Sequence, residues 1–201
     1  PSTTGVNPNP FYLGTDGFTT PNYYGGLMDE VGIFNTAEPI DNLWDGSGKP
    51  TNLASLNPIA WYRMGDNGAY KDPQWLIPSN ENKDKASNYS IEFDGVDDYV
   101  DLGSDDSLDI FGGDFTISLW AKWGNQSSNS NGLVNFGGST NKALVSLGFV
   151  TEYGKISFGI GNSTSLNVLY DMGSGYNDNQ WHSIICKITS GVRAVYVDGI
   201  D

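Results

Sequence analysis

The densest group of chemistry-bearing side chains lies in one short segment, Asp94-Gly95-Val96-Asp97-Asp98. Calcium binds oxygen ligands from carboxylates and backbone carbonyls, and acidic turns that contain glycine supply both. Asp side chains that accept backbone N–H groups inside a turn would use the same residue types without any metal. The segment therefore predicts either a calcium site or a turn capped by its own carboxylates.

Aromatic side chains beside polar residues are the second group with a chemical role. A tyrosine ring offers a large apolar face with a polar tip, which suits contact with a sugar ring. Aromatic residues also cover strand ends in ordinary β-proteins, so both roles stay open. The candidates stand next to Asn, Asp or Gly: Tyr23, Tyr24, Tyr170 and Tyr176.

Hydrolytic chemistry finds little support in the sequence. His182 is the sole histidine, and no Gly-x-Ser-x-Gly segment supplies a nucleophile for it. Glycoside hydrolases use two neighbouring carboxylates. The glutamates, however, are scattered along the chain at Glu30, Glu38, Glu81, Glu92 and Glu152. We therefore predict that the protein is not an enzyme, and a glycoside hydrolase is the least favoured alternative.

The composition limits the classes of partner. The chain has 24 acidic and 10 basic residues and a formal net charge of −14, which argues against binding nucleic acid. The same balance suits a self-repelling surface protein or one that collects divalent cations. No apolar run reaches the length of a membrane span, so we expect no membrane insertion. The single cysteine, Cys186, lies in an apolar run and is expected to be buried rather than reactive.

Short segments with alternating polarity indicate an all-β chain. The clearest is 115–123, in which every second residue is apolar. In 25–34, alternation places Leu27, Asp29, Val31 and Ile33 on one face, and 37–44 could form one or two helical turns capped by Thr36. Two antiparallel sheets should enclose a core. The residues that we expect to be buried in it are Phe93, Phe115, Ile117, Leu119, Trp181 and Val197.

Several segments in order resemble a laminin G-like jelly roll of the concanavalin A-like lectin/glucanase group. Segments 93–100, 115–120, 181–182 and 196–199 are similar to the opening and central strands of that family, and 25–34 is similar to its closing strand. The resemblance implies an all-β, antiparallel two-sheet jelly-roll sandwich. Its closing strands stand at the N-terminus, so the register is either permuted within one chain or exchanged between chains. In this family the Trp-His pair at 181–182 is structural.

The resemblance also extends the metal hypothesis. A structural calcium often joins early and late strands in similar jelly rolls, which implies a site formed by Asp29, Asp94 and Asp97. Segment 61–66 resembles the start of a further domain. We therefore expect closing strands in 1–45, a linker with one strand in 46–88, and the opening and central strands in 89–201.

The order of these segments looks most like that of tandem-domain structural proteins of marine bacterial viruses. The resemblance implies a non-enzymatic structural or adhesion module of a repetitive extracellular or virion-surface protein. Neighbouring copies of the chain are the expected partners, joined head to tail by strand complementation or tandem repetition. The main alternative is a calcium-dependent lectin module that binds surface glycans.

Overall fold

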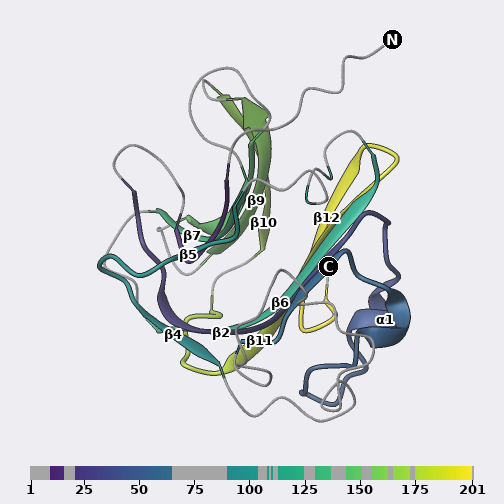
Figure 1. Ribbon diagram of the computed structural model, residues 1–201, viewed down its shortest axis with the longest axis horizontal. Helices are drawn as coiled ribbons and strands as arrows, with labels where there is room; N and C mark the ends of the chain where they lie inside the picture. Colours follow the sequence, from purple (N-terminus) through teal and green to yellow (C-terminus); the bar gives the residue numbers. More distant parts are fainter. Residues whose placement is uncertain are drawn as a thin grey trace. The chain divides into compact units, whose positions relative to one another are not determined.

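The protein is described by a computed structural model in which almost all regular structure is β-strand (Figure 1). The structure describes residues 10–15, 21–64, 90–103, 108, 110, 113–124, 130–136, 144–150, 155–162, 165–172 and 175–200. The sheet registers of the described residues are antiparallel, which is the strand arrangement of a jelly-roll sandwich, and the all-β prediction is confirmed. The strands belong to two compact units, which are described separately below.

The first unit contains a sheet in the order β10-β9-β8-β7-β1-β5. Its strands are β1 (Phe11–Leu13), β5 (Val100–Asp101), β7 (Ser130–Phe136), β8 (Leu144–Val150), β9 (Lys155–Asn162) and β10 (Ser165–Met172). Phe11 and Leu13 of β1 are buried and pair with Phe136 and Val134 of β7. The intervening Tyr12 is only half-buried, as the two-residue period of a strand requires.

The second unit contains a sheet in the order β12-β11-β6-β2-β3, with β4 also paired to β2. Its strands are β2 (Gly25–Phe34), β3 (Ala60–Tyr62), β4 (Ile91–Asp94), β6 (Phe115–Lys122), β11 (Trp181–Thr189) and β12 (Val192–Val197). The last two residues of β4, Phe93 and Asp94, belong to the first unit. Ser190 and Gly191 join β11 to β12 and both have positive φ, of 49° and 79°. Two such residues form the tight turn that matches the twist of a β-hairpin.

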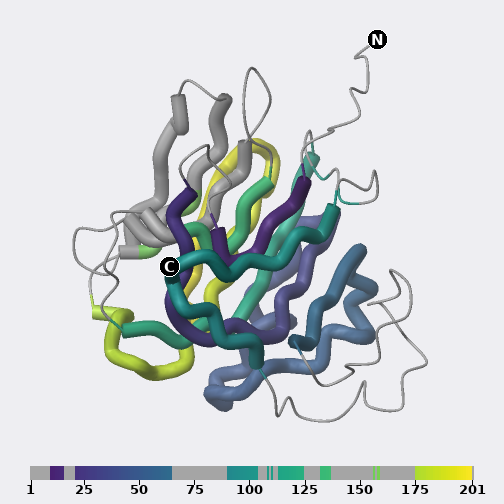
Figure 2. The backbone as a smooth tube through the Cα atoms, turned by 60° about the vertical axis from the view of Figure 1, so that its left-hand side comes forward, coloured from purple at the N-terminus to yellow at the C-terminus, as the bar shows by residue number. Residues whose placement is uncertain are grey.

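The N-terminal strands occupy interior positions in both sheets. β1 lies between β5 and β7, and β2 lies between β3 and β6. Figure 2 shows these purple segments beside teal segments that come much later in the sequence. Each sheet therefore includes a strand from the start of the chain as an internal member. In this structure both strands pair with strands of the same chain.

A bulge in β2 changes which of its side chains share a face. Asp29 is the Cα partner of Trp120, but Gly32 is the partner of Ser118, so β2 has one residue more than β6 between these pairs. Glu30 takes a left-handed conformation there, with φ 49°. Because one extra residue inverts the alternation that follows, Asp29 and Ile33 lie on opposite faces. The prediction that they share a face is wrong.

The face of β6 that carries Thr116, Ser118 and Trp120 is covered by the segment that follows β2. This segment includes α1 (Ile40–Leu43) and the short 3-10 helix η1 (Ala54–Leu56). Its apolar side chains form a cluster with residues of the sheet: Phe34, Leu43, Leu53, Trp61 and Ile185. The Thr116 hydroxyl donates to the Thr36 carbonyl at 2.8 Å and accepts the Glu38 N–H at 2.8 Å. Both faces of β6 are therefore buried.

Two local predictions are wrong in this unit. The residue before α1 is Pro39, and no side chain caps the helix, because the Thr36 hydroxyl bonds to the Glu38 carboxylate at 2.6 Å instead. Trp181 is 37% exposed. It is the first residue of β11 and pairs with Lys122 at the last position of β6, so it lies at the end of the sheet. The other five predicted core residues are buried: Phe93, Phe115, Ile117, Leu119 and Val197.

Candidate functional site

The acidic segment forms a turn that begins where β4 ends. One carboxylate oxygen of Asp94 accepts the N–H groups of Val96 at 2.7 Å and of Asp97 at 3.3 Å. Oδ2 of Asp98 accepts the N–H of Asp94 at 3.0 Å. Gly95 has φ +77°, and a Cβ there would lie 3.2 Å from the backbone of Gly25, so glycine suits the close approach. The capped-turn interpretation thus describes the hydrogen bonds of this segment.

The same three carboxylates could also hold a metal ion. Asp94, Asp97 and Asp98 each place a carboxylate oxygen within 4.8 Å of the others, and all three are exposed. Hard oxygen ligands of this kind fit calcium. Asp29 is not one of these three: it is buried at the bulge of β2 in the other unit, where its Oδ1 accepts the Glu30 N–H at 2.8 Å. The structure thus brings together two of the predicted ligands, Asp94 and Asp97, and adds Asp98.

A patch of three tyrosine rings, Tyr12, Tyr23 and Tyr99, lies in the same unit as this turn. Tyr99 directly follows Asp98 and is 52% exposed. Its ring centroid lies 5.7 Å from that of Tyr12 and 6.5 Å from that of Tyr23. Burial raises the pKa of the Tyr12 phenol, and the nearby Asp101 and Tyr99 raise it further. The patch therefore presents neutral aromatic surface with polar tips beside an acidic turn.

Sequence reasoning identified Tyr23 in this patch but missed Tyr12 and Tyr99. The missing signal is the register of β1, which makes Tyr12 the direct partner of Asp101 in β5. Tyr24 is fully buried and packs its ring 5.7 Å from that of Phe93, so it has no face open to a sugar. Tyr170 lies in β10 opposite Phe158, and its side chain is outside the described part of the chain.

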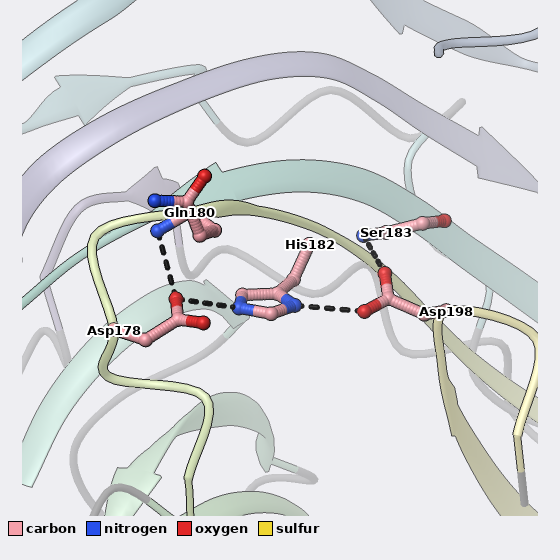
Figure 3. A network of polar contacts seen from close by, with 5 residues as sticks. All are labelled: Asp178, Gln180, His182, Ser183 and Asp198. Carbon is pink, nitrogen blue, oxygen red and sulfur yellow. Dashed lines mark hydrogen bonds and ion pairs between the residues drawn. The ribbon is translucent and has the colours of Figure 1, made fainter. Parts of the chain in front are cut away.

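Tyr176, the last of the predicted platforms, packs its ring against that of His182. His182 lies at the centre of a polar network (Figure 3). Nδ1 of His182 lies 2.8 Å from Oδ2 of Asp198, and Nε2 lies 3.1 Å from Oδ1 of Asp178. Tyr176 and Trp123 make T-shaped contacts with the imidazole, with ring centroids 5.2 Å and 5.4 Å from its own. The two carboxylates lie on opposite sides of the ring, so they do not converge on a common metal position.

The charges in this network shift the pKa values of its members. The hydrogen bond to Asp198 raises the pKa of His182 most, partial burial opposes this, and Asp178 adds to the rise. The pKa of Asp178 is lowered, mainly because its carboxylate accepts the Gln180 N–H at 2.8 Å and also because it faces His182. Both shifts favour the charged forms of the two groups.

A buried ion pair between β2 and the residue that follows β3 was not predicted from the sequence. Nε of Arg63 donates to Oε1 of Glu30 at 2.9 Å, and the indole N–H of Trp61 donates to Oε2. The Arg63 guanidinium also lies 4.8 Å from the centroid of the Trp61 ring. Glutamates scattered in sequence gave no sign of this pairing, because Glu30 faces these donors from a bulge that the local pattern does not reveal.

Comparison with known proteins gives one family. The model of the concanavalin A-like lectin/glucanases superfamily, of the laminin G type, matches residues 94–201, more than half of the chain. No curated protein and no solved structure matches the sequence significantly. Within the described residues, none of the helical segments is a candidate for a membrane-spanning helix.

Proposed function

Since the chain belongs to the concanavalin A-like lectin/glucanases superfamily, we propose that it is a non-catalytic structural or adhesion module of a repetitive extracellular or virion-surface protein. Domains of the laminin G type fit lectin or adhesion modules, are usually extracellular and are typically not catalytic.

The contacts of the single histidine, His182, are the main support for a non-catalytic role. A general base must have a ring nitrogen available to a substrate. Both nitrogens of His182 instead face carboxylates, at 2.8 Å and 3.1 Å. The buried Glu30 is likewise bound by Arg63 and Trp61. These side chains therefore support the fold, and the exposed Tyr99 and the exposed aspartates beside it are what a partner would meet.

A hydrolysis assay tests the non-catalytic part of the proposal. The chain should release no reducing sugar from a panel of marine and bacterial polysaccharides, with a known glycosidase as the positive control. Release that disappears in Glu30→Gln or His182→Gln, while the variant remains folded by circular dichroism, would overturn the proposal.

Copies of the chain would associate through β1 and β2. The support is that these strands take interior places in both sheets, so exchanging them would join two copies by many backbone hydrogen bonds. Two differently tagged copies, unfolded and refolded together, should then form mixed oligomers in sedimentation and tag-capture experiments. A monomer at every concentration would reject assembly by exchange and leave adhesion by a single module.

A calcium-dependent lectin is the second candidate, and the tyrosine patch beside the acidic turn favours it. Tyr99 is the most exposed of the three rings, so Tyr99→Ala should weaken glycan binding about tenfold. Tyr99→Phe keeps the ring and should retain most of the affinity. Val192→Ala, which trims another exposed apolar side chain, serves as the control. A glycan array with no binding in either calcium or chelator would exclude this candidate.

A further inference from the structure

His182 occupies a position that only its protonated form can satisfy completely. A carboxylate oxygen faces each ring nitrogen, Asp198 at Nδ1 and Asp178 at Nε2 (Figure 3). A neutral imidazole carries one N–H, so it can donate to one of these ionised groups and must turn a lone pair towards the other. The imidazolium carries two N–H groups and donates to both. The geometry is therefore built for the cation.

The His182 ring connects two turns of the second unit, one before β11 and one after β12. Asp178 lies in the turn before β11, and its Oδ1 also accepts the Gln180 N–H at 2.8 Å. Asp198 lies just after β12, and its Oδ1 accepts the Ser183 N–H at 2.9 Å. The Asp198 N–H in turn donates to the Ser183 carbonyl at 3.0 Å. His182 thus ties the entrance of β11 to the exit of β12.

Few other ionisable groups surround the ring among the residues that the structure describes. Within that part of the chain, the titratable side chains that face it are Asp178, Asp198 and the Tyr176 phenol, and Trp123, which follows β6, brings no titratable group. The His182 side chain is 9% exposed, so its contacts with the two carboxylates are partly shielded from solvent. Charge on the imidazole is therefore decided mainly by the two carboxylates.

We propose that His182, Asp178 and Asp198 form a proton-operated clasp that holds the β11–β12 hairpin tightly at mildly acidic pH and loosens as the pH rises. When the imidazolium loses its proton, one of its two carboxylate contacts is lost. The turn before β11 or the turn after β12 is then released from the ring. The clasp does not depend on the proposed function, because it concerns the stability of the fold.

The pKa shifts give the direction and the limits of the effect. The folded-state pKa of His182 is raised, so its stabilisation is complete below about 6.5, the ordinary value, and is lost as the pH rises through the folded value. The folded-state pKa of Asp178 is lowered, so its contribution is complete above its ordinary value and is lost as the pH falls through the folded value. The clasp is therefore strongest in the acidic window between the two ordinary values, from about 4 to about 6.5.

Nuclear magnetic resonance can observe the clasp directly, because the chain has a single histidine. The long-range nitrogen–proton spectrum of the folded protein should give a pKa for His182 above about 6.5. For each pKa unit by which folding raises the value, the equilibrium constant for unfolding should be about tenfold smaller at acidic pH than at alkaline pH. A pKa at or below the ordinary value would overturn the proposal.

Variants separate the clasp from other pH effects. The clasp predicts that the denaturation midpoint falls between pH 6 and 9. In His182→Gln this fall should disappear, and an unchanged fall would overturn the proposal. Asp178→Asn removes a half-exposed carboxylate and should lower the pKa of His182 while the protein stays folded, which keeps the test available if His182→Gln does not fold. Asp114→Asn is the matched control: that carboxylate accepts the Ser190 N–H at 2.6 Å, at the opposite end of the β11–β12 hairpin from His182. It should leave the titration of His182 unchanged, and an equal shift in both Asn variants would count against the clasp.

Discussion

Glu30 and Arg63 form a salt bridge of 2.9 Å inside the second unit, with side chains only 3% and 6% exposed. Glu30 lies at the bulge of β2, and Arg63 directly follows β3, which pairs with β2. The second oxygen of Glu30 accepts the indole N–H of Trp61. A buried charge is stable when its partner and its hydrogen bonds are both present. The bulge, the ion pair and the pairing of β3 with β2 therefore depend on one another.

Arg63→Met should destabilise the fold by about 3–5 kcal/mol, because it leaves the Glu30 carboxylate buried without its cation. The double variant Glu30→Gln with Arg63→Met removes that charge and should be more stable than Arg63→Met alone. Lys49→Met is the control, since it deletes a positive charge at an exposed position and should change stability by less than about 0.5 kcal/mol. Urea denaturation gives the three values. A double variant no more stable than Arg63→Met would show that the charge is not the cause.

The bulge in β2 also explains why the prediction from the sequence differs from the structure of this strand. Strand alternation predicted correctly that 25–34 forms a strand. Alternation assumes an unbroken two-residue period, and the left-handed residue Glu30 breaks it. Nothing in the local pattern marks that position, because a bulge is specified by tertiary partners, here Arg63 and Trp61.

The candidate sites show a similar division. The acidic turn could be predicted because Asp94, Asp97 and Asp98 are close in sequence, and a short segment with glycine folds them together. The tyrosine patch could not, because Tyr12 meets Tyr99 only through the pairing of β1 with β5. The burial of Tyr24 likewise depends on Phe93, which is distant in sequence. Local chemistry was therefore predictable, while chemistry that depends on strand pairing was not.

Gly199 should resist substitution more strongly than a glycine with the same backbone angle in open space. It follows Asp198 in the turn after β12 with φ +77°, and a Cβ there would collide with the Trp44 ring. Trp44 cannot yield easily, because its ring packs 5.5 Å from that of Trp120. Gly46 has φ +78° and no atom within 4 Å of the equivalent position.

Gly46→Ala should therefore cost about 1–2 kcal/mol from the left-handed backbone alone. Gly199→Ala should cost about 1–3 kcal/mol more, because it adds the steric clash. Thermal unfolding of the two variants measures the difference. Equal losses would mean that Trp44 moves aside and that its packing on Trp120 is weak.

Calcium should raise the thermal stability of the chain if the acidic turn holds the ion. A ligand that binds only the folded state at about 100 times its Kd stabilises it by about 2.7 kcal/mol. Chelator should reverse the rise, and Asp97→Asn or Asp98→Asn should reduce it. Asp45→Asn is the control, because Asp45 caps an exposed turn by accepting the Ser47 N–H at 2.8 Å. A melting temperature that does not respond to calcium would leave the three carboxylates as turn caps only.

Cys186 should be unreactive in the folded protein. It lies in β11 between Ile117 of β6 and Val195 of β12, and its thiol is completely buried. Burial raises its pKa well above the ordinary value, so at neutral pH the thiolate that reacts with disulfide reagents is scarce as well as inaccessible. A chromogenic disulfide should therefore label the chain only as fast as it unfolds, and labelling should rise with urea along the same curve as the loss of circular dichroism. Rapid labelling of the native protein, with the circular dichroism spectrum unchanged, would show that β11 opens locally without global unfolding.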